Sequence, residues 1–272
     1  MRFSILVFFV LLIITACSKI KYDTTDTVYG GLSLYNASYT LNSYLPSSGN
    51  QRSIVLPITG DLSQTPLLKG SSTPIFSPAS GCRLDFPAIN WRYEVPWTVF
   101  DHYTPGHYTG KVYLNSTNSN SLLTFPLNVI KDRMSTYFIS DSLGTFHSSM
   151  VEYDNAPAEG YISLQLIQLC PDADSINMRI GNNLLEGMQN IPYRKVSPII
   201  NYRLPADSIL KLRVFNGGDT LQVIARTDLP VTSGRAYMII LKHYRQTHGY
   251  IDLEGHSVDI VPNASLDIRK VY

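Results

Sequence analysis

The chain has 272 residues, of which 44% are hydrophobic and 16% are charged, with a formal net charge of +1. This composition excludes an intrinsically disordered chain, which combines low hydrophobicity with high net charge. It also lacks the basic excess of a nucleic-acid-binding surface, so we expect no nucleic-acid partner. Helix-favouring Glu and Lys are scarce while Tyr is abundant, which favours strands. The length suits one large or two modest domains.

Residues 1–16 have the pattern of an export signal. Arg2 supplies a positive charge, and 5–14 are an unbroken apolar run, shorter than the about 20 residues that a membrane-spanning helix needs. Ile14-Thr15-Ala16-Cys17 resembles a bacterial lipobox. The resemblance implies cleavage before Cys17 and attachment of acyl chains to this residue. By resemblance to enterobacterial sorting signals, Ser18 after it favours the outer membrane, and whether the protein faces the periplasm or the outside stays open.

Removal of residues 1–16 would leave a mature chain with no net charge. Arg2 is lost, so the 22 basic residues become 21 and balance the 21 acidic ones. Membrane attachment would then depend on the acyl chains at Cys17 rather than on a polybasic patch. We expect residues 17–27, which are polar and aperiodic, to be the lipidated cysteine followed by a flexible tether.

Triplets of Asp, then Ser or Thr, then an aliphatic residue or Thr occur six times. They resemble the O-glycosylation sequon that some gut and oral anaerobes use on exported proteins. Entry from a turn into a strand explains the triplets at Asp207 and Asp219 without modification. The two triplets in the tether have no such structural reason, so Thr24 and Thr27 are the candidate O-glycosylation sites.

Beyond the tether, many short segments alternate between apolar and polar residues, including 162–166, 176–180, 210–214 and 221–223. This alternation predicts half-buried strands. Landmarks also recur about 100 residues apart, pairing Tyr93 with Tyr193, Pro105 with Pro205, Val112 with Val214, and Tyr137 with Tyr237. We therefore predict an all-β fold of two tandem immunoglobulin-like antiparallel β-sandwich domains, at 28–147 and 160–272. A loop at about 50–81 is inserted in the first, and a linker at 148–159 joins them.

Residues 169–182 (Leu-Cys-Pro-Asp-Ala-Asp-Ser-Ile-Asn-Met-Arg-Ile-Gly-Asn) resemble the opening motif of the domain of unknown function 4397 family. Cys170 stands where that family has Ser, Asp174 stands where it has Pro, and the first copy lacks the Pro-Asp-Ala turn. The resemblance implies a bacterial exported protein, often a lipoprotein, with repeated β-sandwich domains. It implies no activity.

No motif for catalysis or for a cofactor is present. The sequence lacks a Gly-x-Ser-x-Gly elbow, a phosphate-binding glycine loop and a Cys pair at zinc spacing. We expect no catalytic residue, no metal and no cofactor. His102 and His107 flank a turn, and a solvated hairpin tip explains them better than a metal site. Cys82 and Cys170 would be the thiols left after lipidation, as a bridge or as two separate buried thiols.

Trp91, Tyr93 and Trp97 alternate along one predicted strand and share a face. An exposed face of this kind would stack on sugar rings, whereas such residues in β-sandwiches usually belong to the core. The sequence thus predicts a non-catalytic, lipid-anchored envelope protein with a binding or structural role. One alternative is a surface carbohydrate-binding lipoprotein, and another is an anchor or accessory subunit of a surface filament. The expected partners are the membrane, through the lipid, and a glycan or an envelope protein.

Overall fold

The computed structural model describes residues 30–44, 58–59, 101–103, 105–112, 121–153, 156–204, 208–252 and 255–271. Strands dominate these ranges, which hold one short α-helix, α2 (Tyr39–Tyr44). The predicted all-β class is confirmed. Within the same ranges, no helix is long and apolar enough to cross a membrane.

Seven strands form the N-terminal unit, which we define as the described residues between 30 and 153. They are β1 (Gly30–Asn36), β2 (Ile58–Thr59), β3 (Asp101–Tyr103), β4 (Gly106–Val112), β5 (Leu123–Val129), β6 (Met134–Ser142) and β7 (Thr145–Tyr153). One sheet has the order β3-β1-β6-β7 and the other β2-β4-β5. Residues 148–153 of the predicted linker therefore belong to strand β7.

Eleven strands form the C-terminal unit, the described residues from 156 to 271. They are β8 (Tyr161–Leu169), β9 (Ser175–Ile180), β10 (Asn183–Leu184), β11 (Ile191–Pro192), β12 (Ile200–Arg203), β13 (Ser208–Asn216), β14 (Asp219–Val231), β15 (Ala236–Lys242), β16 (His248–Ile251), β17 (Ser257–Ile260) and β18 (Ser265–Lys270). One sheet has the order β12-β8-β15-β18 and the other β10-β9-β13-β14, with β11 also paired to β9. Strands β16 and β17 form a separate hairpin.

Both units contain one sheet with the same arrangement of strand directions. In β3-β1-β6-β7 and in β12-β8-β15-β18, the two central strands are parallel and each outer strand is antiparallel to its neighbour. The prediction of purely antiparallel sheets is therefore wrong at β1–β6 and β8–β15. The physical reason is the connection: the chain crosses to the opposite sheet and returns, so the later strand starts at the same end as the first.

Two tyrosines occupy equivalent positions in the two units. Tyr137 pairs with Leu34 across the parallel strands, and Tyr237 pairs with Leu164 in the same way. Each phenol oxygen accepts a hydrogen bond from a backbone N–H close to the end of the preceding strand. For Tyr137 the donor is Asn128, near the end of β5, at 2.7 Å, and for Tyr237 it is Thr232, directly after β14, at 2.9 Å. The predicted pairing of Tyr137 with Tyr237 thus corresponds to one shared structural feature.

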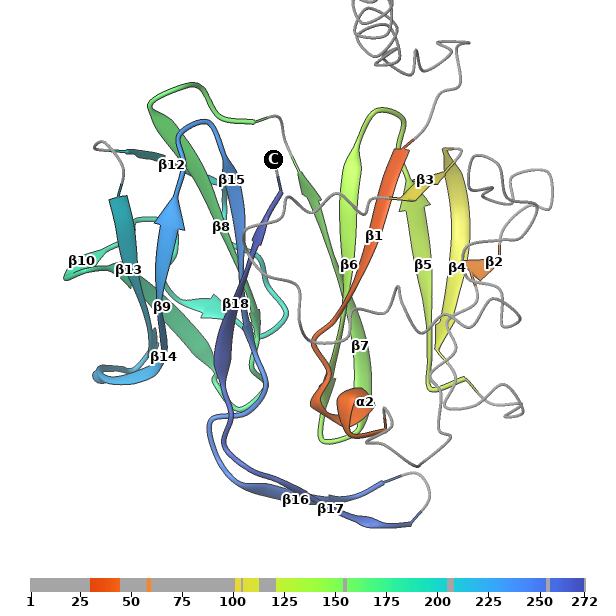
Figure 1. Cartoon of the computed structure of the whole chain (residues 1–272). Coiled ribbons are helices and arrows are strands. Elements are labelled where there is room, and N and C mark those ends of the chain that lie inside the picture. The colour runs from red at the N-terminus through yellow and green to blue at the C-terminus, as the bar shows by residue number, and fades with distance from the viewer. Residues whose placement is uncertain are drawn as a thin grey trace, which may run out of the picture.

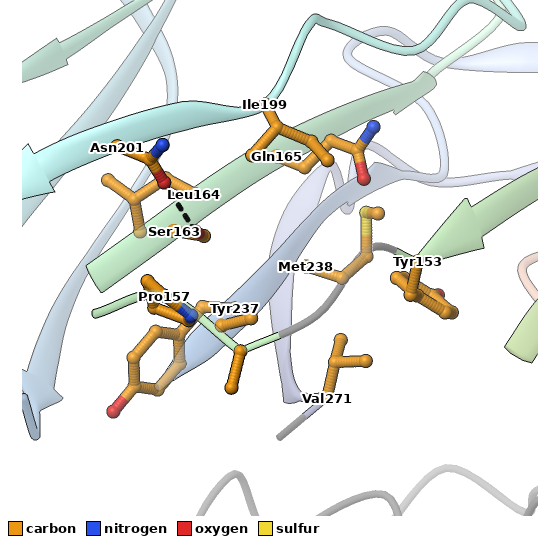
Figure 2. A pocket seen from close by; sticks show the side chains of 12 residues that line it. Tyr153, Pro157, Ser163, Leu164, Gln165, Ile199, Asn201, Tyr237, Met238 and Val271 are labelled. Atoms are coloured by element: carbon orange, nitrogen blue, oxygen red, sulfur yellow. Dashed lines mark hydrogen bonds between the residues drawn. The ribbon is translucent and has the colours of Figure 1, made fainter. Parts of the chain in front are cut away.

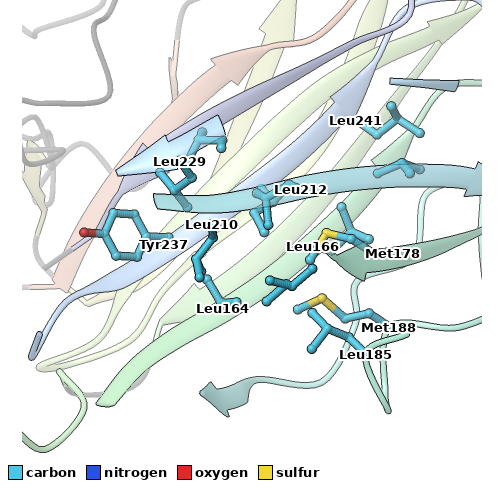
Figure 3. Packing of buried hydrophobic residues seen from close by; sticks show 14 of the residues in the cluster. Leu164, Leu166, Met178, Leu185, Met188, Leu210, Leu212, Leu229, Tyr237 and Leu241 are labelled. Atoms are coloured by element: carbon cyan, nitrogen blue, oxygen red, sulfur yellow. The ribbon is translucent and has the colours of Figure 1, made fainter. Parts of the chain in front are cut away.

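The four sheets stack face to face, as Figure 1 shows. One apolar cluster lies between the sheets of the N-terminal unit and contains Leu32, Phe125 and Ile139. A larger one lies between the sheets of the C-terminal unit, and Figure 3 shows its leucines and methionines interdigitating. A third cluster, which includes Phe138 and Met238, joins the two units. The two central sheets are therefore packed on both faces.

The third cluster explains why the central strands are buried along almost their whole length. All seven residues of β1 are buried, and so are seven consecutive residues of β6. In β8 the alternating polar residues Ser163 and Gln165 lie on the face toward the other unit instead of solvent. Gln168 lies on the opposite face and is fully buried. Its amide is satisfied locally, because Nε2 donates to the carbonyls of Cys170 and Ala173 and Oε1 accepts from the Cys170 N–H.

The segment 221–223 differs from its prediction as a half-buried strand. Leu221 is 90% exposed and Val223 is 41% exposed. The reason is an irregularity in the β13–β14 pairing, where the register shifts on both sides of Phe215. Such a bulge changes which side chains face the core.

Candidate functional site

The predicted site residues lie outside the described part of the chain. These are Cys17, Thr24, Thr27, Trp91, Tyr93 and Trp97. Lipidation, O-glycosylation and aromatic stacking therefore stay predictions. Cys82 and most of the loop at about 50–81 also lie outside the described ranges.

A pocket of about 200 Å³ lies where the two units meet. Figure 2 shows it between the end of β7, the segment 156–157, the first residues of β8 and β15, and strand β12. Tyr153 comes from the N-terminal unit, whereas Gln165, Asn201 and Met238 come from the C-terminal unit. The parallel pairing brings the starts of β8 and β15 together, since Ala236 pairs with Ser163. We call this site the junction pocket.

Three side chains supply hydrogen-bonding groups to the junction pocket. Ser163 donates its hydroxyl hydrogen to Oδ1 of Asn201 at 2.6 Å, and Nε2 of Gln165 donates to the carbonyl of Ser197 at 3.3 Å. Among the described residues, the Asn201 amide nitrogen and the Gln165 carbonyl oxygen have no hydrogen-bond partner. The two N–H donors of Asn201 and the carbonyl oxygen of Gln165 therefore remain for a ligand.

Among the described residues that line the junction pocket, none has a carboxylate, imidazole, thiol, amine or guanidinium side chain. Tyr153, Pro157 and Met238 add apolar surface beside the amides. The phenols of Tyr153 and Tyr237 are the titratable side chains of the described lining. The lining therefore combines amide, hydroxyl and phenol groups with apolar surface.

A buried carboxylate fixes the two units against each other at the far end of the central strands. Asp141 is 3% exposed. Its oxygens accept the hydroxyl hydrogens of Ser38 at 2.5 Å, Thr40 at 2.7 Å and Tyr244 at 3.1 Å. They also accept the backbone N–H groups of Thr40 at 3.2 Å and Gly144 at 3.3 Å. Tyr244 belongs to the C-terminal unit and the other donors to the N-terminal unit, so we call this set the Asp141 cluster.

Two tyrosines extend the Asp141 cluster toward the β16–β17 hairpin. The Tyr244 oxygen accepts the Leu143 N–H at 2.7 Å, and the Tyr250 hydroxyl lies 2.8 Å from that of Thr40. Burial, and next the charge of Asp141, raise the pKa of Tyr244. The phenol therefore remains a neutral hydrogen-bond donor at physiological pH. Sequence reasoning missed this cluster; the available signal was an Asp two residues after the apolar run 137–139 of β6.

A second polar cluster crosses the same interface. Tyr35 of β1 donates its hydroxyl hydrogen to Asp267 of β18 at 2.5 Å and accepts from Nζ of Lys242 at 2.9 Å. Arg269 donates to the same Asp267 oxygen at 2.7 Å. Burial, and then the Asp267 charge, raise the pKa of Tyr35. Burial lowers the pKa of Lys242, although Asp267 opposes this shift.

Asp172, within the Pro-Asp turn of the family-like motif, holds a distant loop. Its carboxylate accepts the backbone N–H groups of Arg245 at 2.9 Å and Gln246 at 2.8 Å, and it lies 3.0 Å from Nε2 of His248. Burial acts to raise the pKa of Asp172, but the hydrogen bonds from Arg245, Cys170, His248 and Gln246 outweigh it and lower the pKa. The motif thus fixes the loop that leads into β16.

The histidines and cysteines of the described ranges do not form a metal centre. No group of three or more His, Cys, Asp or Glu side chains converges there. Strand β3, which contains His102, pairs with β1, whereas His107 lies in β4 of the other sheet, so the two do not form one hairpin. Cys170 is buried, its thiol lies 3.1 Å from Asp172, and burial raises its pKa.

Comparisons with known proteins establish no family for this chain. No family model and no curated protein matches it. Among solved structures, one described as "Alpha-glucan binding by a streptococcal virulence factor" aligns with a TM-score of 0.23 and 10% sequence identity. The alignment covers 80% of this chain and 93% of the other. The resemblance to the domain of unknown function 4397 family stays a prediction.

Proposed function

We propose that this chain is a lipid-anchored, non-catalytic protein of the bacterial cell envelope that binds a small neutral ligand in the junction pocket. The observation that carries the binding role is the lining of the pocket. It offers unpaired amide groups and apolar surface, and none of the side chains that carry a charge at neutral pH. Ligand pockets typically combine an apolar wall with a few convergent polar groups.

A carbohydrate is the ligand class that this lining fits best. A sugar ring presents hydroxyl groups, which both donate and accept, next to C–H faces that pack on apolar or aromatic side chains. Asn201 can donate to one hydroxyl and Gln165 can accept from another, while Tyr153 and Met238 offer apolar contact. At about 200 Å³ the pocket accommodates one or two rings rather than a long chain.

A glycan array probed with the mature chain tests this proposal, followed by calorimetry on any oligosaccharide that binds. Gln165→Ala and Asn201→Ala should each weaken binding by about tenfold, since a hydrogen bond to a neutral group contributes roughly 0.5–1.5 kcal/mol and tenfold is 1.4 kcal/mol. Asn183→Ala is the matched control, because Asn183 is an exposed amide on β10. Equal affinity of all variants, or no glycan bound by the wild type, would refute the assignment.

The anchor at Cys17 and the outer-membrane location are proposed from the sequence. Cys17→Ala should abolish incorporation of a fatty-acid tracer and release soluble protein, whereas unchanged membrane attachment would contradict lipidation. Thr24→Ala combined with Thr27→Ala should lower the intact mass if the tether is O-glycosylated. An unchanged mass would exclude modification at these two positions.

We also infer that the two units are tandem copies of one β-sandwich domain. The matching strand directions of β3-β1-β6-β7 and β12-β8-β15-β18 support a duplication, as do the equivalent hydrogen bonds of Tyr137 and Tyr237. The parallel central pair departs from the immunoglobulin arrangement, in which an ABED sheet faces a CFG sheet. A separately expressed C-terminal unit tests how far each copy folds alone, since its inner sheet would lose the third apolar cluster.

A further inference from the structure

Three arginines form one row across the outer sheet of the C-terminal unit. Arg213 on β13 pairs with Arg179 on β9 on one side and with Arg226 on β14 on the other. Their neighbours along the strands, such as Met178, Leu212 and Ala225, belong to the apolar cluster between the sheets. Because side chains alternate along a strand, the three arginines point away from the core. This sheet is at one end of the four-layer stack (Figure 1).

The arginine row concentrates positive charge on a protein that is otherwise balanced. Adjacent strands are about 4.8 Å apart, so the three guanidinium groups extend from a line about 10 Å long. Like charges directly opposite each other on a sheet destabilise it. The whole chain has a net charge of +1, so the row is a strong local departure. Mutual repulsion among the three charges therefore does not stabilise the sheet.

None of the three arginines has an acidic partner among the described ion pairs. In the next row, Lys211 pairs with Asp228 across β13 and β14 and balances that carboxylate. The Arg179 guanidinium lies 4.7 Å from the centre of the Phe215 ring, which holds it in place. Its buried Nε has no hydrogen-bond partner within the described ranges. The guanidinium N–H groups of the arginine row are therefore available to an external anion.

We propose that the arginine row binds an acidic polysaccharide. A guanidinium group offers two parallel N–H donors that match a carboxylate or sulfate, and the row repeats this fork in a line. Exposed apolar side chains flank the row, with Leu184 44% and Val223 41% exposed, and they suit the C–H faces of sugar rings. Anionic lipid surfaces are typically bound by clusters of about 4–8 Lys and Arg residues, more than this row supplies.

The test measures binding of the full mature chain, immobilised through a C-terminal tag, to polygalacturonate and to heparin. Neutral dextran and phosphatidylglycerol vesicles serve as comparison probes. Arg213→Gln and Arg179→Gln should each weaken binding of the acidic polymers by about tenfold, as expected for loss of one hydrogen bond to a charged group. Arg235→Gln removes the same charge from an exposed loop position and should bind like the wild type. Added salt should weaken binding.

A thermal melt separates loss of binding from loss of folding. Because Arg213 faces like charges on both sides, Arg213→Gln should leave the melting temperature unchanged or raise it while binding falls. Carboxylate and sulfate polymers distinguish the two anion chemistries. Equal binding by Arg213→Gln and wild type, capture of the vesicles but not of the polymers, or no binding to either polymer would each overturn the proposal.

Discussion

Replacing the buried carboxylate of Asp141 by an amide tests how the two units are held together. Asp141→Asn preserves the shape of the side chain but turns one acceptor oxygen into a donor NH₂ group. Oδ1 faces the Ser38 hydroxyl and the Thr40 N–H, while Oδ2 faces two hydroxyls and the Gly144 N–H. Whichever way the amide is oriented, its NH₂ group meets a backbone N–H that cannot accept a hydrogen bond.

The expected cost follows from this geometry. A hydrogen bond to a charged group contributes about 1.5–3 kcal/mol, and a buried donor left unpaired costs about 1–3 kcal/mol. The hydroxyls of Ser38, Thr40 and Tyr244 can rotate and recover part of this loss. We therefore expect Asp141→Asn to lower the free energy of unfolding by about 3 kcal/mol. With a urea m-value of about 3 kcal/mol/M, the midpoint would shift by about 1 M.

Urea unfolding, monitored by far-ultraviolet circular dichroism of the backbone, measures this shift. Asp228→Asn, an exposed carboxylate on β14, is the control and should change stability by less than about 0.5 kcal/mol. Tyr244→Phe removes the donor from the C-terminal unit. Combined with Asp141→Asn it should cost less than the sum of the single changes, because both remove the same hydrogen bond. A loss below about 1 kcal/mol for Asp141→Asn would refute the role of this cluster.

Three further predictions concern pH and packing. The pKa of Asp172 is lowered in the fold, so its contribution to stability is present above the unfolded pKa of about 3.9 and is lost as pH falls below it. Asp172→Asn should remove this acid dependence of the urea midpoint, and the same pH dependence in the variant and the wild type would contradict the prediction. Burial lowers the pKa of His243 to about 4, so protonation favours the unfolded chain and stability should fall as pH drops from about 6.5 to 4. His243→Asn, which tolerates the positive φ of 70° at this position, should flatten urea midpoints across that window. Phe138→Ala empties a fully buried site between the units and should cost about 3–5 kcal/mol in one cooperative transition; an early transition confined to one unit would indicate independent domains.

Alternation along the chain was sufficient to predict individual strands. The segment 210–214 lies in β13 with Leu210, Leu212 and Val214 toward the core, and 176–180 lies in β9 in the same manner. Two-residue periodicity reports which side chains share a face, and the sheet that contains both strands has one apolar face. The repeat was harder to align. The sequence of residues 29–35 is similar to that of 161–167, which would make Leu34 equivalent to Leu166, whereas the register makes Leu34 equivalent to Leu164, two residues away. A shift of two keeps the same face, so periodicity alone does not detect it.

The interface between the units was not predictable from periodicity. In β8, Ser163 lies on the face expected to meet solvent, yet it is buried, and Gln168 is a fully buried polar residue on the opposite, apolar face. Short-range hydrogen bonds satisfy Gln168, and those bonds depend on the turn that follows β8. Asp141 is likewise satisfied by residues about 100 positions away. A polar side chain does not reveal whether water or a distant partner will accept its hydrogen bonds, so burial of a polar face requires the tertiary structure.

The register also places the junction pocket at one end of the stack of sheets. Gly31, Met134 and Tyr153 share one rung across β1, β6 and β7, so the pocket beside Tyr153 is at the end of the stack where β1 begins. The Asp141 cluster and the β16–β17 hairpin lie at the opposite end (Figure 1), about 20 Å away along a seven-residue strand. The pocket at this end suits a short ligand, whereas the arginine row lies on an open lateral face that a long polymer can reach. The two proposed sites would then serve different ligands, and Gln165→Ala should leave binding of the acidic polymers unchanged.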